Sequence, residues 1–91
     1  MNTTPSPESL IEYPCAFPIK IMGLAVQDLA QTILSIVTRH DPSFDGATME
    51  MRASSSGKYL SLTCTVLATS RPQLDALYTE LSTHPLVKVV L

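Results

Sequence analysis

The segment 54–58, Ser-Ser-Ser-Gly-Lys, is the part of the chain that most resembles a chemical motif, because it looks like the end of a phosphate-binding loop. Such a loop requires G-x-x-x-x-G-K-[ST] between a buried strand and a helix N-terminus, whose N–H groups hold the phosphates. Arg52 stands where the first glycine is required, and Tyr59 follows Lys58 in place of Ser or Thr. Both flanking segments alternate apolar and polar residues, as strands do. We therefore predict a β-hairpin turn in which Gly57 supplies a positive φ, and no nucleotide site.

The cysteines and histidines form no pattern typical of catalysis or metal binding. Cys15, Cys64, His40 and His84 stand singly, without C-x-x-C or H-x-x-x-H spacing. Cys64 falls on the apolar side of an alternating segment, so we expect a small core residue and not a reactive thiol. His40 is predicted to end a helix, and His84 to lie in a turn before Pro85. The sequence predicts no catalytic residue, no metal site and no cofactor.

The composition is that of one small domain. The chain has 91 residues, of which 45% are hydrophobic and 15% charged, and its net charge is −2. That charge disfavours a general nucleic-acid binder, which usually has a basic excess. No segment resembles a secretion signal or reaches the roughly 20 apolar residues of a membrane helix, so we expect a soluble, cytoplasmic protein. Residues 1–14 contain three prolines and are predicted to form a flexible arm before a domain at 15–91.

The spacing of the apolar residues predicts an alternation of strands and helices. A period of two predicts a strand, and a period of 3.6 predicts a helix with one apolar stripe. Val26 and His40 mark the ends of the first stripe, and Ser70 is a helix cap with Gln73 completing a capping box. The predicted strands and helices, in chain order, are strand 17–23, helix 24–40, strand 48–54, strand 59–68, helix 70–83 and strand 86–91.

This order predicts an α+β fold, the ferredoxin-like βαββαβ two-layer sandwich. Right-handed crossovers place the strands in the antiparallel order 4-1-3-2, with both helices on one face. The other face is expected to be open to water. In the last strand, Val87, Val89 and Leu91 are predicted to point inward, while Val90 points to the open face with Leu67 of the third strand.

The chemistries that this fold supports elsewhere lack their residues here. Acylphosphatases need an Arg in the first strand-to-helix loop and an Asn, but that loop contains no Arg and the chain's one Asn is Asn2. Metal chaperones need a C-x-x-C in the same loop. RNA-recognition domains stack bases on aromatic residues of the central strands. The residues predicted to point outward there are Lys20, Met22, Ser61, Thr63 and Thr65.

The open face and the last strand remain as candidate binding surfaces. Lys20, Arg52 and Lys88 are expected to spread over the open face with Glu50, where they could attract an anionic ligand. The apolar Val90 and Leu67 favour a protein partner. The final strand is predicted at the sheet edge with Lys88 as its only charge, so Val87, Val89 and Leu91 are candidates for dimerisation or strand addition.

Several short segments carry a family resemblance: FPIKIMG, SSSGKYLSLTCTVLA, QLDALYTEL and PLVKVVL. The chain from about Tyr13 to Leu91 resembles the YbeD-like family of small bacterial proteins. The resemblance implies a fold shared with ACT-type regulatory domains, which bind small metabolites at subunit interfaces. In such domains a glycine in the first strand-to-helix loop lets the backbone approach the ligand, and Gly23 has that position; a glycine needed only to turn the chain is the alternative.

These observations predict a regulatory or protein-interaction module that is not an enzyme. The candidate ligand-binding residues are Lys20, Gly23, Arg52, Lys58 and Lys88; Lys58 is included because turn chemistry explains Gly57 but not the lysine after it. The partner is expected to be a protein or a small metabolite, with a homodimer through the edge strand or the sheet face as one form. The alternatives are a sensor that binds an amino-acid-like metabolite at a homodimer interface and, less favoured, weak RNA binding on the open face.

Overall fold

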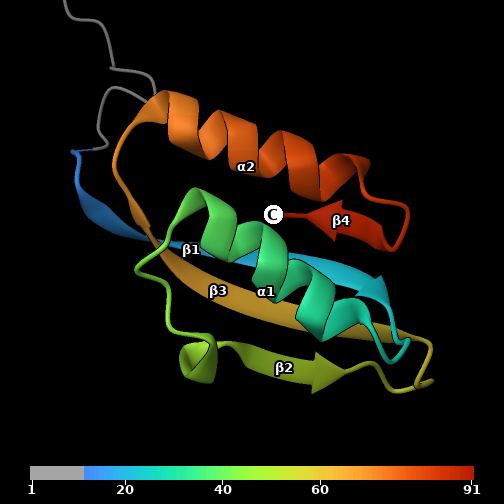
Figure 1. Cartoon of the computed structure of the whole chain (residues 1–91). Helices are drawn as coiled ribbons and strands as arrows, with labels where there is room; N and C mark the ends of the chain where they lie inside the picture. Colours follow the sequence, from blue (N-terminus) through green and yellow to red (C-terminus); the bar gives the residue numbers. More distant parts are fainter. Residues whose placement is uncertain (1–11) are drawn as a thin grey trace, which may run out of the picture.

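Two long strands form the centre of the sheet in the computed structural model, which describes residues 12–91 (Figure 1). Strand β1 (Cys15–Leu24) pairs antiparallel with β3 (Tyr59–Ala68) along its whole length. Strand β2 (Glu50–Ala53) pairs with the outer side of β3, and β4 (Val87–Val90) with the outer side of β1. The order β2-β3-β1-β4 is the predicted 4-1-3-2 order read from the other edge, so the ferredoxin-like fold is confirmed. Most of the predicted N-terminal arm lies outside the described residues.

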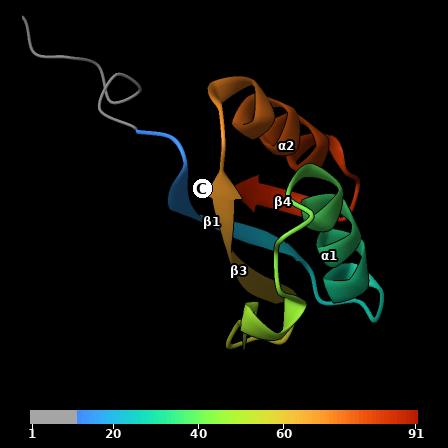
Figure 2. The same cartoon turned by 60° about the vertical axis from the view of Figure 1, so that its left-hand side comes forward.

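Both helices pack on one face of the sheet, and the opposite face is open (Figure 2). Helix α1 (Leu29–His40) buries Leu29, Ile33, Ile36 and Val37, and α2 (Arg71–Thr83) buries Leu74, Leu77 and Leu81. The Ser70 hydroxyl accepts a hydrogen bond from the Gln73 N–H (3.2 Å), and Pro72 lies in the first turn, where a missing N–H costs little. The inward residues of β1 and β3 complete the core, among them Ile19, Ile21, Leu62, Cys64 and Val66.

Helix α1 begins five residues later than the spacing predicted. Strand β1 continues through Leu24, whose N–H donates to the Leu86 carbonyl (3.0 Å). The next N–H, of Ala25, donates to the carbonyl of Lys58 (2.9 Å). Contacts with two distant loops therefore hold these residues outside a helix. Val26 is exposed and does not belong to the apolar stripe.

Strand β2 is shorter than predicted, because a turn of 3-10 helix, η2 (Gly46–Thr48), precedes it. Asp45 stabilises this turn: its carboxylate accepts from the Ala47 N–H (2.9 Å). Met51 pairs with the buried Leu62 and so belongs to the helix-facing side, yet it is 59% exposed.

Strand β4 contains one residue more than a regular pairing allows, and this corrects the predicted orientations. Gly23 pairs with Val87, but the preceding Met22 pairs with Val89, so the register shifts at Lys88. The alternation is reversed beyond that point. Val87 is buried as predicted, whereas Val89 (43% exposed) and Leu91 (71%) do not point inward. Val90, predicted to face outward, packs against the core.

Candidate functional site

The pairing of the strands aligns the outward side chains of the open face in two cross-strand rows. One row contains Glu50 of β2, Thr63 of β3 and Lys20 of β1. The neighbouring row contains Arg52, Ser61 and Met22 on the same three strands, and Val89 of β4 extends it. The two rows bring charged, hydroxyl and apolar groups together in the middle of the face.

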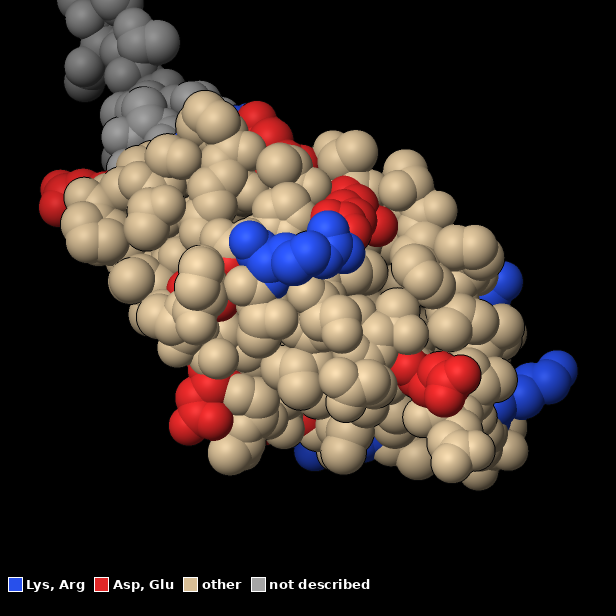
Figure 3. Space-filling model, in the orientation of Figure 1, with Lys and Arg blue, Asp and Glu red and all other residues tan. Residues whose placement is uncertain are grey.

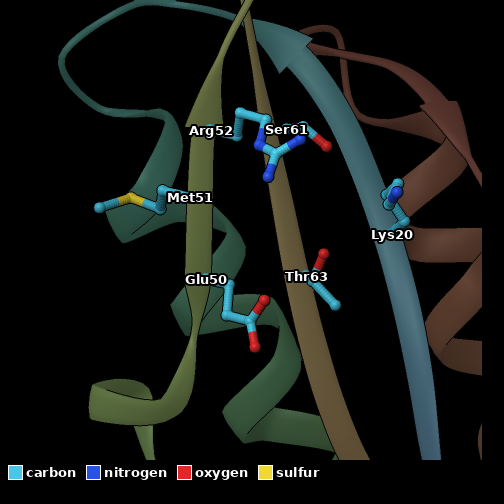
Figure 4. Close-up of a pocket in the computed structure, with 6 residues that line it drawn as sticks. All are labelled: Lys20, Glu50, Met51, Arg52, Ser61 and Thr63. Atoms are coloured by element: carbon cyan, nitrogen blue, oxygen red, sulfur yellow. The ribbon is translucent and has the colours of Figure 1, made fainter.

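Two shallow hollows lie on these rows, and Figure 4 shows the first of them. The first has a volume of about 230 Å³ and the second about 250 Å³. Lys20, Arg52 and Ser61 line both hollows. Figure 4 shows the Arg52 side chain extending over β3 beside Ser61, and Glu50 turned toward Thr63, while Met51 points to the other side. We call the six residues Lys20, Met22, Glu50, Arg52, Ser61 and Thr63 the central site.

The two cations of the central site differ from those on the helices. Salt bridges join Arg39 and His40 to Glu80, the latter at 2.7 Å, and Arg71 to Asp75 at 3.0 Å. Within residues 12–91, Lys20 and Arg52 take part in no salt bridge. Figure 3 shows the helix-covered side of the molecule, where a basic group lies directly beside an acidic group.

Apolar side chains lie next to these cations. Met22 is 38% exposed and pairs with Val89, which is also exposed. Leu91 lies next to Lys20, because the backbone groups of the two residues exchange hydrogen bonds of 2.8 and 3.2 Å. The prediction that Leu67 points outward is correct, since 43% of it is exposed. The face therefore changes from charged at β2 to apolar at β4.

The other predicted ligand-binding residues do not line the two hollows. Gly23 is buried, and a Cβ added to it would lie 2.5 Å from the Leu86 carbonyl oxygen and 2.9 Å from Leu29. Close packing within the chain thus accounts for this glycine. Lys58 lies in the β2–β3 turn, and Lys88 is the exposed residue at the β4 bulge.

Segment 54–58 is the hairpin turn that the sequence predicted. The Ser54 N–H donates to the Tyr59 carbonyl (2.9 Å), and the Ser54 hydroxyl accepts from the Tyr59 N–H (3.1 Å). Gly57 has φ 78°, in the region that favours glycine. The serines therefore satisfy backbone groups of the turn, which joins two strands and no helix.

The thiols and imidazoles take structural positions. Cys64 is fully buried, so the prediction of a small core residue is confirmed, and burial raises the pKa of its thiol to about 11. Cys15 is a free, partly buried cysteine. The His84 ring accepts a hydrogen bond from the Leu86 N–H (3.1 Å). No group of three or more metal-ligating side chains occurs in the part of the chain that the structure describes.

A network around Asp41 and Gln73 was missed by the sequence reasoning. The buried Asp41 carboxylate accepts hydrogen bonds from the Ser43 hydroxyl (2.6 Å) and the Leu67 N–H (2.9 Å). Burial alone would raise the pKa of this carboxyl, but the hydrogen bonds outweigh burial and lower it. The Gln73 amide donates to the carbonyls of His40 (3.0 Å) and Leu67 (3.1 Å). Asp41 and Gln73 thus join the end of α1, the end of β3 and the start of α2.

The helices of residues 12–91 are too short to cross a membrane.

Comparison with known proteins places the chain in a family and supports its fold. A family model described as "Protein of unknown function (DUF493)" matches residues 8–91. A UPF0250 protein of Nitrosomonas europaea is 60% identical over 84 residues, which cover 92% of this chain and 97% of the relative. A UPF0250 protein of Ralstonia nicotianae is 60% identical over 88 residues, covering 97% and 91%.

Two solved structures have the same fold at low sequence identity. The ACT domain of a GTP pyrophosphokinase from Chlorobium tepidum has a TM-score of 0.66 at 16% identity, covering 85% of this chain and 97% of that domain. A solution structure of an H. pylori protein has a TM-score of 0.69 at 19% identity, covering 100% and 98%. The expected ACT-like fold is confirmed, and the extensive match of sequence shows that the chain belongs to the DUF493 family, which corresponds to the predicted YbeD-like resemblance.

Proposed function

We propose that this protein is a cytoplasmic regulatory module that acts by binding a partner protein on the open face of its sheet, without catalysing a reaction. One observation carries the proposal: Lys20 and Arg52, which have no salt-bridge partner within residues 12–91, lie beside the exposed Met22 and Val89. Exposed apolar groups next to polar ones mark many protein interfaces, and Met and Arg are enriched there. The free thiols Cys15 and Cys64 fit a reducing compartment.

The chemistry of the central site fits binding better than catalysis. Its nucleophilic candidates are the hydroxyls of Ser61 and Thr63, and neither hollow has a histidine in its lining to activate them. The buried Cys64 thiol, with its raised pKa, would supply little thiolate. Exposed cations on a shallow surface are better suited to orienting a binding partner than to catalysing a reaction.

Site-specific photo-crosslinking in cells that make the protein natively tests the proposal. A photoreactive amino acid replaces the exposed Thr65 on the open face of β3 or, as a matched control, the exposed Ser35 on α1. We expect a crosslinked product from position 65 and none from position 35. Equal products from both positions, or none from position 65, would contradict binding on the open face.

A second candidate is self-association or strand addition at β4, favoured by its place at the sheet edge. Strand β4 pairs with β1 on one side, and no described strand pairs with its other side. A homodimer formed there could create a metabolite site between subunits. Lys20 and Leu91 exchange backbone hydrogen bonds, so Val89 also bonds to β1 and the N–H of Val90 points to the free edge. Light scattering before and after Val90→Pro therefore tests self-association there: a dimer that becomes a monomer supports it, and a monomer in both states removes it.

A further inference from the structure

We propose that the partner presents an amphipathic helix with acidic side chains along one flank: a carboxylate binds between Arg52 and Lys20, and apolar residues pack on Met22 and Val89. This inference rests on the proposed function and adds the chemistry of the partner.

The geometry of the two cations defines the anion position. Arg52 on β2 and Lys20 on β1 lie on either side of β3 and in neighbouring rows, so their backbones are about 12 Å apart at the usual strand geometry. Figure 4 shows the Arg52 side chain extending over β3, which shortens the gap. The hydroxyls of Ser61 and Thr63 form the floor between them. An incoming carboxylate can therefore receive two N–H bonds from the Arg52 guanidinium and one from Lys20.

Glu50 selects against polyanions. It lines the same hollow as Lys20 and Arg52, two residues before Arg52 on the same side of β2. A single carboxylate can bind over Ser61, in the row that contains Arg52 and not Glu50, and Lys20 can reach it from the neighbouring row. A nucleic-acid backbone would place successive phosphates along the face, and one of them would approach Glu50. Two cations and one carboxylate thus favour an isolated acidic side chain over RNA.

The neighbouring apolar residues provide the second half of the recognition. Met22 is adjacent to Ser61 in the cross-strand row, and Val89 is the next residue beyond it. Apolar anchors on the partner must therefore lie about 5–10 Å from its carboxylate. The surface of an α-helix offers this separation, because residues three or four positions apart have Cβ atoms about 5–6 Å apart and the helix is about 10 Å wide.

A helix also fits the hydrogen-bonding properties of this surface better than a strand. The backbone N–H and C=O groups of a sheet bond within its plane, so the face offers side chains only. An extended segment lying on the face would leave its own backbone groups without protein partners, whereas a helix satisfies most of its own.

Three synthetic peptides of equal length test this assignment in binding experiments with the 91-residue chain. The first is helical with a leucine stripe and a glutamate flank; the second has lysine in place of glutamate; the third has alanine in place of leucine. Binding is followed by 15N–1H NMR titration at low and physiological salt. We expect the first peptide to shift the amides of Lys20, Met22 and Ser61 and to bind at least ten-fold more tightly than the other two.

Charge reversal supplies the decisive variant. In Lys20→Glu/Arg52→Glu we expect the glutamate peptide to lose its binding and the lysine peptide to gain it. Lys58→Glu reverses the charge of one turn lysine outside both hollows and is the control, which should leave binding unchanged. A lysine peptide that binds the unmodified chain as well as the glutamate peptide does would overturn the inference. Shifts confined to the helices, or tighter binding of a single-stranded RNA, would do the same.

The two proposals fail separately. If position 65 crosslinks to a partner but the glutamate peptide does not bind, the open face is an interface and the acidic helix is wrong. If position 65 gives no product, both proposals fall.

Discussion

The two sides of the sheet use their cations in opposite ways. On the helix side, Arg39 and His40 of α1 both bind the Glu80 carboxylate of α2. The hydrogen bond from Arg39, and to a smaller extent that from His40, lowers the pKa of this carboxyl. On the open side, Arg52 and Lys20 have no salt bridge to Glu50, although all three line one hollow. The difference teaches that the helix-side charges fasten two elements of the chain together, while the open-side charges remain accessible to another molecule.

The largest expected difference between the two sides lies within one strand. Leu62 on β3 is fully buried, whereas its neighbour Thr63 faces the open side. We expect Leu62→Ala to lower the free energy of unfolding by about 2–5 kcal/mol, because it leaves a cavity, and Thr63→Ala to change it by no more than about 0.5 kcal/mol. Urea denaturation followed by circular dichroism measures both. Similar losses would mean that the open side is packed as a core.

The second effect concerns Gly23, which lies under the Leu86 carbonyl. A methyl group at this position would have to displace backbone, so we expect Gly23→Ala to cost about 1–3 kcal/mol of unfolding free energy. Gly57→Ala is the matched control: apart from Gly57 and its two neighbours, no atom of residues 12–91 lies within 4 Å of the new Cβ, and the positive φ alone should cost about 1–2 kcal/mol. Urea midpoints compare the two. A Gly23→Ala variant as stable as the unmodified chain would show that the contact relaxes easily and would revive a ligand role for this glycine.

The third effect is the acid sensitivity that Asp41 confers. The pKa of Asp41 is lower in the folded chain than its ordinary value of 3.8, so its carboxylate stabilises the fold above that value. This stabilisation is lost as the pH falls from about 5 through the lowered pKa. Asp41→Asn replaces one of the two acceptor oxygens by an NH2 group, so either the Leu67 N–H or the Ser43 N–H loses its acceptor, and we expect a loss of about 1–3 kcal/mol at pH 7 and a flatter decline in acid.

Denaturation experiments at several pH values between 7 and 2 measure how Asp41→Asn changes the dependence of stability on pH. Asp28→Asn is the control, because Asp28 is exposed and its side chain does not cap α1. A decline in acid that is equally steep in Asp41→Asn and in the unmodified chain would show that other carboxyl groups cause it.

The smallest effect compares the two arginines directly. Arg39→Ala should cost about 0.2–1 kcal/mol, because the lost ion pair is largely exposed, and Arg52→Ala should cost nothing measurable. Thermal unfolding at low and high salt distinguishes the two variants, because screening by salt should remove the loss of stability caused by Arg39→Ala. A salt-sensitive loss in Arg52→Ala would instead reveal an internal role for that cation.

The sequence predicted the strand order and the open face because its strongest signals are periodic. The alternation in residues 59–68 and the apolar stripes of both helices depend on local geometry that every such element shares. The outward positions of Lys20, Arg52 and Glu50 in the central site were predictable for the same reason, because these residues lie on regular strands. The β4 bulge could not be predicted, because Val-Lys-Val-Val reads equally well in either phase.

The remaining errors have tertiary causes. Helix α1 starts late because Leu24 and Ala25 bond to loops that are distant in sequence. Asp41 before a proline indicated only a helix stop; its bonds to Ser43 are local, but its bond to the Leu67 N–H required the fold to be known. A capping-box pattern likewise does not indicate that the Gln73 side chain joins the end of α1 to the end of β3.

The surplus residue at Lys88 has an evolutionary consequence. If Lys88 paired regularly with Met22, Val89 would face the core and Val90 the solvent; the bulge exchanges these two roles, while the long central strands keep their pairing. A substitution that removed the bulge without changing the length of the chain would therefore replace Val89 by Val90 on the recognition surface of a relative.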